Sequence, residues 1–253
     1  MDPHKESILR RAIDYVEYLS LYEKELYLRK ELLAPRARPK SAAAQTGQKA
    51  ASGLNPYPEY APYSSLAQME TAIRGCLRCA LGAGRTKFVF GVGSAEAKVV
   101  FIGEGPGAEE DKRGEPFVGR AGVLLNEMLE QIEWRREDVY ICNMIKCRPP
   151  NNRDPLPQEI AMCEPYLHEQ LRLLQPQIIV ALGRIAAHAL LGTQASLGSM
   201  RGRLHSFRGI PLWVTYHPAA LLRNQNLMPD AHQDLLTLKR MVTSGSLTSE
   251  GER

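Results

Sequence analysis

Apolar and polar positions follow two regular patterns between residues 66 and 242. Short apolar runs rich in β-branched residues predict buried strands at residues 99–102, 139–145, 177–182 and 211–215. Apolar residues recur every three or four positions, as in helices, at residues 66–73, 124–129, 158–174, 185–191 and 230–242. Strands that alternate with helices form a parallel sheet covered on both faces. The pattern therefore predicts an α/β fold, a three-layer α/β/α sandwich around a four-stranded parallel sheet.

The first 65 residues follow a different pattern. Residues 1–33 carry one apolar stripe and predict an N-terminal helix, which either packs on its own domain or binds a partner or a second copy. Residues 34–65 are rich in Pro, Ala, Ser and Gly and predict a flexible, basic linker. The expected organisation is thus a helix, a linker, a compact domain at 66–242 and a polar tail at 243–253.

Composition restricts the functional class only slightly. The 253 residues carry a formal net charge of +4, which permits a polyanionic partner without requiring one. No run approaches the length of a membrane span, and the N-terminus lacks the apolar core of a secretory signal. We therefore expect a cytoplasmic protein without membrane contact. In that compartment cysteines serve as thiols or ligands more often than as disulfides.

A glycine-rich turn follows the strand at 99–102. Its sequence, GEGPG at 103–107, cannot continue a strand, and its backbone can approach a ligand closely because three of its residues lack a Cβ atom. Pro106 interrupts a dinucleotide fingerprint, and no Gly-Lys-Ser/Thr follows that would make a phosphate-binding loop. The turn is either an ordinary strand-to-helix connection or a binding site at the end of a strand.

Four of the five cysteines come in two separated segments. Cys76 and Cys79 form a C-x2-C pair, Cys147 follows the second predicted strand, and Cys163 lies near the next helix. Four thiolates from two segments can hold either zinc or an iron–sulfur cluster, and unliganded buried cysteines are the alternative. Cys142 lies within an apolar strand and is expected to belong to the core.

Four motifs in order carry a family resemblance. They are GEGPG, EPFVGRAG (115–122), CNMIKCRPPNNR (142–153) and YHPAALLR (216–223), with the four cysteines interleaved. Over residues 66–242 the chain resembles a family 4 uracil-DNA glycosylase of the uracil-DNA glycosylase superfamily. The resemblance implies a [4Fe–4S] cluster on Cys76, Cys79, Cys147 and Cys163. It implies a DNA repair enzyme that releases uracil and leaves an abasic site for base excision repair.

The motif residues suit the capture of a flipped uracil. Phe117 can stack on the pyrimidine, and the Asn143 amide matches the uracil O4 and N3–H groups, whereas cytosine presents the reverse pattern. Backbone groups of the turn at Gly103, Glu104, Gly105 and Gly107 can bind a uracil oxygen. His217 can stabilise the negative charge that develops on O2, or it is a core histidine satisfied by backbone groups.

The residues after His217 suit contact with DNA. Leu221 or Leu222 can wedge into the gap that the flipped base leaves, and Arg223 can hold a phosphate. Lys146 lies near the end of a strand, and we expect it to contact a phosphate rather than to form a Schiff base. Uracil-containing DNA is therefore the expected partner.

The choice of carboxylate is open at this stage. Family 1 uracil glycosylases have an Asp that activates water in the corresponding turn, where this chain has Gly105. Glu104 or Glu110 must then orient the water or offset the oxocarbenium charge; the resemblance favours Glu110, with help from Asn152. The alternative for Glu110 is a solvated helix start. The segment after Arg148 lacks the basic insertion with a reactive His of covalent-trapping relatives, so a monofunctional turnover enzyme is expected.

Two rival functions remain compatible with the sequence. One is a non-catalytic nucleic-acid-binding module that keeps the fold and the cluster. The other is a zinc-dependent α/β enzyme that acts on a small molecule.

Overall fold

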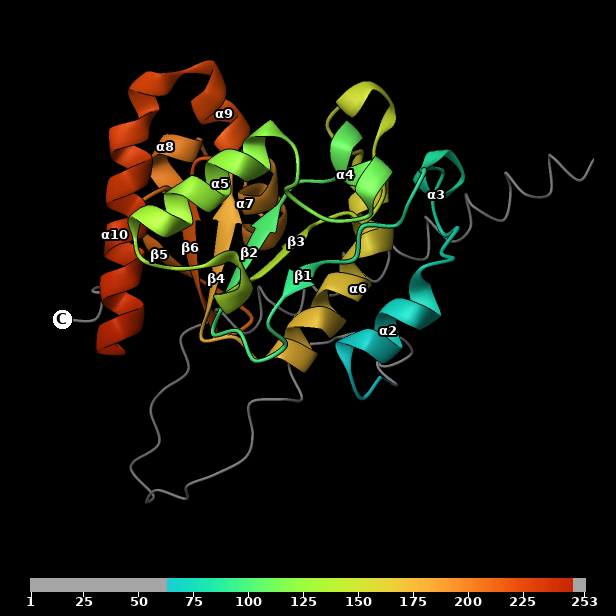
Figure 1. Cartoon of the computed structure of the whole chain (residues 1–253), viewed down its shortest axis with the longest axis horizontal. Coiled ribbons are helices and arrows are strands. Elements are labelled where there is room, and N and C mark those ends of the chain that lie inside the picture. Colours follow the sequence, from blue (N-terminus) through green and yellow to red (C-terminus); the bar gives the residue numbers. More distant parts are fainter. Residues whose placement is uncertain (1–62, 248–253) are drawn as a thin grey trace, which may run out of the picture. The chain divides into compact units, whose positions relative to one another are not determined.

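The computed structural model describes residues 63–247 (Figure 1). Our predictions for the helix at 1–33, for nearly all of the linker and for the last residues of the tail lie outside this range. Among the described residues, no helix combines the length and the apolar character needed to cross a bilayer.

A six-stranded sheet forms the centre of the domain. Its strand order is β1-β3-β2-β4-β6-β5, and the four inner strands run parallel. The strands span Val92–Gly93 (β1), Val99–Gly103 (β2), Tyr140–Asn143 (β3), Ile178–Leu182 (β4), Leu204–Phe207 (β5) and Ile210–Thr215 (β6). The predicted four-stranded parallel sheet is confirmed, and its count is corrected by two antiparallel edge strands, β1 and β5.

The two edge strands escape the hydrophobic pattern for physical reasons. β1 has only two residues, one of them a glycine, so it offers no apolar run. Three of the four β5 side chains are partly or fully exposed, because an edge strand faces solvent on one side. Only the hairpin that joins β5 to β6 leaves a signal in the sequence.

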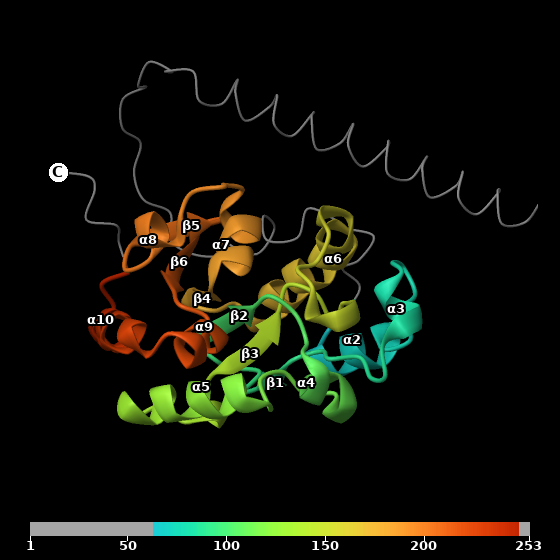
Figure 2. The same ribbon diagram turned by 90° about the horizontal axis from the view of Figure 1, so that it is seen from above.

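Helices cover both faces of the sheet (Figure 2). They span Leu66–Ile73 (α2), Leu81–Gly84 (α3), Ala108–Arg113 (α4), Arg120–Gln131 (α5), Pro157–Leu174 (α6), Arg184–Leu191 (α7), Leu197–Met200 (α8), Pro218–Arg223 (α9) and Met228–Ser244 (α10). Residues of α6, α7 and α8 share one apolar cluster with the sheet, and residues of α5, α9 and α10 share another. The three-layer prediction is therefore confirmed.

Alternation along the strands separates these two layers. On β2, Val100 and Ile102 belong to the cluster with α6 and α7, whereas Val99 and Phe101 belong to the cluster with α5 and α10. This is the period of two that a strand imposes on its side chains. Because β2 is buried on both faces, it appears in the sequence as one continuous apolar run.

A third, smaller apolar cluster lies beside the sheet. It joins Met69 and Ile73 of α2 and Leu81 of α3 to Ile145, which follows β3, and to Tyr166 of α6. Ser65 caps α2, where its side chain accepts a hydrogen bond from the Gln68 backbone N–H at 3.2 Å. This cluster attaches the segment before β1 to the loop that leaves the carboxyl end of β3.

Candidate active site

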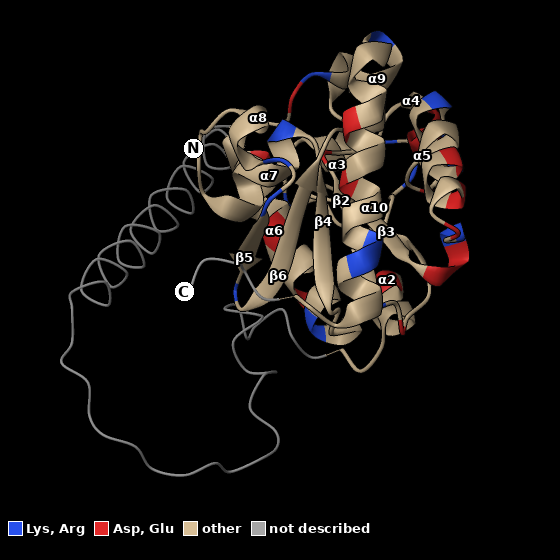
Figure 3. Cartoon of the chain, turned by 90° about the vertical axis from the view of Figure 1, so that its left-hand side faces the viewer, with Lys and Arg blue, Asp and Glu red and all other residues tan. Residues whose placement is uncertain are grey.

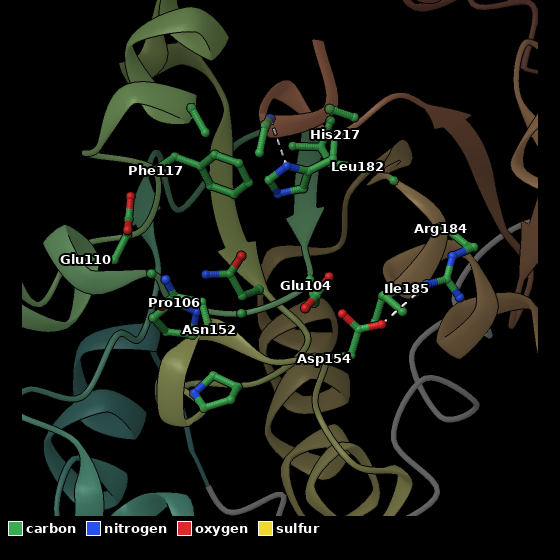
Figure 4. A pocket seen from close by; sticks show the side chains of 18 of the residues that line it. Glu104, Pro106, Glu110, Phe117, Asn152, Asp154, Leu182, Arg184, Ile185 and His217 are labelled. Atoms are coloured by element: carbon green, nitrogen blue, oxygen red, sulfur yellow. Dashed lines mark hydrogen bonds and ion pairs between the residues drawn. The ribbon is translucent and has the colours of Figure 1, made fainter. Parts of the chain in front are cut away.

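A cavity of about 510 Å³ opens at the carboxyl ends of the parallel strands. This edge of a parallel sheet is the usual place for a site, because the loops that leave neighbouring strands meet there. Sequence-predicted residues that line the cavity are Glu104, Gly105, Gly107, Glu110, Phe117, Asn143, Asn152, His217 and Arg223. Residues of four separate motifs thus meet in one space (Figure 4).

Two glycine residues, which lack a Cβ atom, leave room for this site. A Cβ atom on Gly103 would lie 2.5 Å from the Asn143 side-chain oxygen and 2.6 Å from Cζ of Phe117. A Cβ atom on Gly183, which has a φ of +87°, would lie 2.7 Å from Cβ of His217. Glycine is therefore required at both positions for the three functional side chains to approach one another.

Asn143 presents an unpaired acceptor at the end of β3. Its side chain is 2% exposed, and its Oδ1 atom has no hydrogen-bond partner among the described residues. A buried polar atom without a partner is costly, and such atoms often mark the place of a ligand. Because Asn143 lines the cavity, its amide can bind a group that enters there.

His217 lies at the start of α9 with its tautomer set by the backbone. Its Nδ1 atom accepts a hydrogen bond from the Ala219 N–H at 3.1 Å, so the proton of the neutral ring is on Nε2. Burial, with a further contribution from the Arg223 charge, lowers the His217 pKa to about 4. At neutral pH the ring is therefore an uncharged donor, and this second nitrogen faces the open space in Figure 4.

Phe117 forms the wall opposite His217. The two ring centroids are 5.4 Å apart and the ring planes are inclined by 33°. The Phe117 backbone has a φ of +52°, a left-handed conformation that costs energy in a residue with a side chain. Such a conformation persists only where the surroundings hold it.

Two charged side chains hold the Phe117 turn through its backbone groups. Arg136 donates hydrogen bonds to the carbonyl groups of Pro116 and Phe117, the latter at 3.1 Å. Glu110 Oε1 accepts hydrogen bonds from the backbone N–H groups of residues 118 and 119, both at 2.9 Å. We call these two side chains the Phe117 clamp. Burial lowers the pKa of Arg136 from its ordinary value.

Glu104 occupies another wall of the cavity. Burial, reinforced by the negative charge of Asp154, raises the Glu104 pKa to about 7, while the charges of Arg184 and Arg223 oppose this shift. Asp154 forms an ion pair with Arg184 at 3.3 Å, which Figure 4 shows beside Glu104. The charge of this wall therefore changes near neutral pH.

Asn152 lies on the loop between β3 and α6. Asn151 and Asn152 both have left-handed φ angles, and Arg148 Nε donates a hydrogen bond to Asn152 Oδ1 at 2.8 Å. Asn tolerates this conformation better than most residues. The hydrogen bond leaves the Asn152 amide NH2 as the polar group that can serve the cavity.

The four paired cysteines meet in the third apolar cluster, away from Cys142. Cys76 and Cys79 come from the loop between α2 and α3, Cys147 follows β3, and Cys163 lies on α6. Cys142 is fully buried in the sheet, which confirms the expectation that it belongs to the core. Arg85 Nη1 donates to the Cys147 sulfur at 3.3 Å and to the Cys76 carbonyl oxygen at 2.5 Å.

Comparison with known proteins identifies the family. A model of the uracil DNA glycosylase superfamily matches residues 90–237 of the chain. The chain belongs to this superfamily. It is 47% identical over 156 residues to the type-4 uracil-DNA glycosylase of Thermotoga maritima. The aligned region covers 61% of this chain and 81% of that protein.

Two further type-4 relatives have similar identities to this chain. The type-4 uracil-DNA glycosylases of Archaeoglobus fulgidus and Pyrobaculum aerophilum are each 43% identical over 178 residues. Both alignments cover 67% of this chain, with 89% and 91% of the respective relatives. The shared region therefore includes most of each relative, whereas about a third of this chain lies outside it.

The iron–sulfur cluster that the resemblance implies fits the residues present. The donor set consists of four thiols brought together from three parts of the chain in one largely apolar cluster. No three described His, Cys, Asp or Glu residues lie close enough to hold one metal ion.

Two sequence-based predictions about contacts between this chain and DNA need correction. Leu221 is fully buried among α5, α9 and α10, so it cannot wedge into DNA, and only Leu222, which is 37% exposed, remains for that role. Lys146 is also fully buried and cannot reach a phosphate. Spacing alone does not distinguish Leu221 from Leu222, because the short helix α9 turns one of two adjacent leucines inward.

Three residues at the site escaped the sequence analysis. Arg136 lies outside every motif, and nothing in its local pattern indicates that it reaches the Phe117 turn. Asp154 directly follows the third motif, and Arg184 follows the end of β4. Because the carboxyl ends of parallel strands meet at one edge, the position of Arg184 after such a strand was the available signal.

Proposed function

We propose that this chain hydrolyses the N-glycosidic bond of deoxyuridine in DNA, releases uracil and leaves an abasic site for base excision repair. The observation that carries the proposal is the unpaired Asn143 Oδ1 atom in a cavity whose other walls are Phe117 and His217. Membership of the uracil DNA glycosylase superfamily supports the same reaction. It is also the activity named for the type-4 relatives.

Asn143 is the residue that reads the base. Its Oδ1 atom accepts a hydrogen bond from uracil N3–H, and its amide NH2 donates to uracil O4. Cytosine offers an acceptor at N3 and a donor at N4, so the same amide meets two mismatched pairs. Phe117 stacks on the flat ring and gives affinity to any pyrimidine, whereas Asn143 supplies the selection.

His217 supports departure of the base. As the glycosidic bond breaks, negative charge develops on uracil O2, and the neutral Nε2–H group of His217 donates a hydrogen bond to it. Backbone N–H groups of the turn at 103–107 add further donors. A ring with a pKa of about 4 stays neutral at physiological pH, so it stabilises the anion without first losing a proton.

Glu110 is the carboxylate that orients the attacking water. Two backbone N–H groups hold its Oε1 atom, while Oε2 makes no hydrogen bond among the described residues and remains available. Asn152 assists through its amide NH2 group. Glu104 contributes its backbone to uracil binding and adjusts the charge of the cavity through its raised pKa.

Cys76, Cys79, Cys147 and Cys163 hold a [4Fe–4S] cluster. When bound, the cluster supplies a structural cross-link between the α2–α3 loop, the segment after β3 and α6. No step of the proposed hydrolysis needs an electron. The thiols do not line the catalytic cavity, in agreement with a structural role.

DNA approaches over α9. Leu222 and Arg223 are exposed at the end of this helix, and Figure 3 shows a basic position there and acidic positions along α5. The exposed leucine enters the gap left by the flipped uracil, and Arg223 binds a neighbouring phosphate. Like-charge repulsion disfavours a DNA path across α5.

Residues 66–242 form the catalytic unit, and residues 1–65 are a partner-binding or self-association segment on a tether. Deleting residues 1–62 should leave uracil release from short oligonucleotides within about twofold of the full chain, because no proposed site residue lies in that segment. A truncated protein that folds and keeps its iron but releases no uracil would show that the segment belongs to the catalytic unit.

Uracil release and iron content, measured on one preparation, test the proposal. The purified full chain should release uracil from single-stranded or duplex DNA and leave alkali-labile sites, and it should be brown with four irons per chain. Borohydride should trap no covalent adduct, since water is the nucleophile. DNA binding without release would favour the non-catalytic module, and a colourless zinc protein inactive on DNA would favour the small-molecule enzyme.

A further inference from the structure

Lys146 is a buried basic residue without an anionic partner in the part of the chain that the structure describes. Its side chain is fully buried, and its ammonium group donates one hydrogen bond, to the Asn143 carbonyl oxygen at 2.8 Å. No carboxylate among residues 63–247 forms an ion pair with it. A buried charge is costly unless an opposite charge or several hydrogen bonds compensate it, so the protein alone leaves this ammonium incompletely stabilised.

The surroundings of Lys146 indicate where its partner lies. The residue directly precedes Cys147, and its carbonyl oxygen accepts a hydrogen bond from the Val89 N–H at 2.9 Å, which holds this stretch of backbone. Burial raises the pKa of the Cys142 and Cys163 thiols, and the Lys146 charge opposes this rise. Of the two, Cys163 belongs to the apolar cluster in which the four paired cysteines meet.

Along the chain, Lys146 therefore lies between two candidate functional parts, Asn143 and Cys147. On one side is Asn143, whose amide faces the catalytic cavity, and on the other are thiols that suit an anionic group. A [4Fe–4S] cluster held by four thiolates has a net negative charge, which makes it the missing counter-ion. The hydrogen bond to the Asn143 carbonyl holds the peptide whose side chain reads the base.

We propose that Lys146 is a positioning residue that neutralises the cluster with its charge and orients Asn143 with its hydrogen bond, so that cluster and uracil recognition are coupled through one side chain. This inference rests on the proposed function. It adds to that function a link between the cluster and base selection. The link predicts that charge and hydrogen bonding at Lys146 have separable effects.

Two substitutions at Lys146 separate these effects. Lys146→Gln removes the charge but keeps a donor for the Asn143 carbonyl, whereas Lys146→Met removes both in a side chain of similar length. Each holoprotein is measured for iron content, for the midpoint potential of the cluster by protein-film voltammetry, and for inhibition of uracil release by free uracil. Phe117→Leu is the matched control, because it alters the uracil wall without contact to Lys146.

Both Lys146 variants should move the midpoint potential to more negative values, because a nearby positive charge favours the reduced cluster. Free uracil should bind about tenfold more weakly to Lys146→Met, as expected for the loss of a hydrogen bond to a charged donor, and within about twofold of the parent in Lys146→Gln. Phe117→Leu should weaken uracil binding and leave the potential unchanged.

The outcomes distinguish this inference from the proposed function. A parent that contains the cluster and releases uracil, together with Lys146 variants whose potential equals that of the parent, would overturn the inference alone. Equal uracil binding by the parent and Lys146→Met would overturn the inferred coupling between the cluster and uracil recognition. A parent without iron or without uracil release would overturn the proposed function and, with it, the role of Lys146. If Lys146→Met fails to fold, the potential of Lys146→Gln still decides.

Discussion

The binding properties of single residues at this site follow from hydrogen-bonding groups that have no partner within the described part of the protein. Asn143 has an unpaired oxygen, and His217 has one nitrogen occupied by the Ala219 N–H and a second that faces the cavity. Together the two groups suit a ligand with a donor and an acceptor in fixed places. This complementarity makes the individual residues testable.

Replacing His217 should slow catalysis without preventing DNA binding. Loss of one donor to a developing oxyanion typically lowers the rate by about 10²–10³, so single-turnover uracil release by His217→Ala should fall by that factor. DNA affinity, measured by fluorescence anisotropy, should stay within about threefold, because the ring faces the base rather than the phosphates. A rate equal to that of the parent would remove His217 from the mechanism.

Glu104 should make the folded protein less stable as the pH rises. Its folded pKa of about 7 lies above its ordinary value of 4.5, so the folded state binds more protons between these values and the free energy of unfolding falls across this window. Glu104→Gln should remove this loss. The variant should have a higher midpoint of thermal unfolding than the parent at pH 8. At pH 4 and below Glu104 is protonated in the parent as well, so the two midpoints should differ only by the effect of an uncharged replacement.

His217 contributes the opposite slope, which serves as the control for Glu104. Its folded pKa of about 4 lies below 6.5, so the unfolded state binds more protons and stability rises with pH between these values. His217→Ala should therefore remove this contribution, so that the free energy of unfolding rises less with pH between about 4 and 6.5. Identical pH profiles for the parent and Glu104→Gln would show that Glu104 titrates normally.

At the scale of elements, the sequence predicts the parts whose environment is uniform. β2, β3, β4 and β6 are almost entirely buried, so they appear as apolar runs. Most of the cavity was also predictable, because its residues follow these strands in recognisable motifs. The Phe117 clamp was not, since Arg136 reaches Phe117 from 19 residues further along the chain and only the folded turn brings them together.

Removing Arg136 should loosen the Phe117 turn. Arg136→Met keeps much of the buried side-chain volume but removes the hydrogen bonds to the carbonyl groups of Pro116 and Phe117, so the left-handed backbone at Phe117 loses one of its two supports. The KM for a uracil-containing oligonucleotide should rise about tenfold with a smaller change in kcat. Arg135→Met, a change to an exposed neighbour, should leave both values unchanged.

If Arg136→Met instead lowered kcat at unchanged KM, the clamp would act on the chemical step through Glu110 rather than on base capture. Hydrogen exchange at residues 116–119 separates the two roles. Faster exchange should accompany the higher KM, because the same hydrogen bonds restrain the backbone.

At the scale of the whole domain, the buried apolar residues form three separate clusters. Two lie on the faces of the sheet, and the third holds the paired cysteines beside α2, α3 and α6. The third cluster is small and depends on a loop, so we expect the proposed cross-link there to have a large effect on the stability of the whole domain.

Cysteine substitutions should reveal this division. Cys163→Ala should lose iron and precipitate or unfold at lower temperature, because one ligand of the cross-link is missing. Cys142→Ala removes a buried thiol of the sheet core and should keep full iron content with a loss of about 1 kcal/mol in the free energy of unfolding. Iron determination and thermal unfolding measure both; full iron in Cys163→Ala would exclude this residue as a ligand.

The left-handed backbone at Phe117 has a kinetic consequence. Its strained conformation is held by groups of the protein itself, so we expect the entropy of ordering this wall to be lost during folding rather than at each encounter with DNA. In the proposed glycosylase, we then expect this wall to capture a base that has already left the stack, without a loop closure of its own. We therefore expect the rate of capture to follow the spontaneous opening of the base pair, and to be faster for uracil opposite guanine than for uracil opposite adenine.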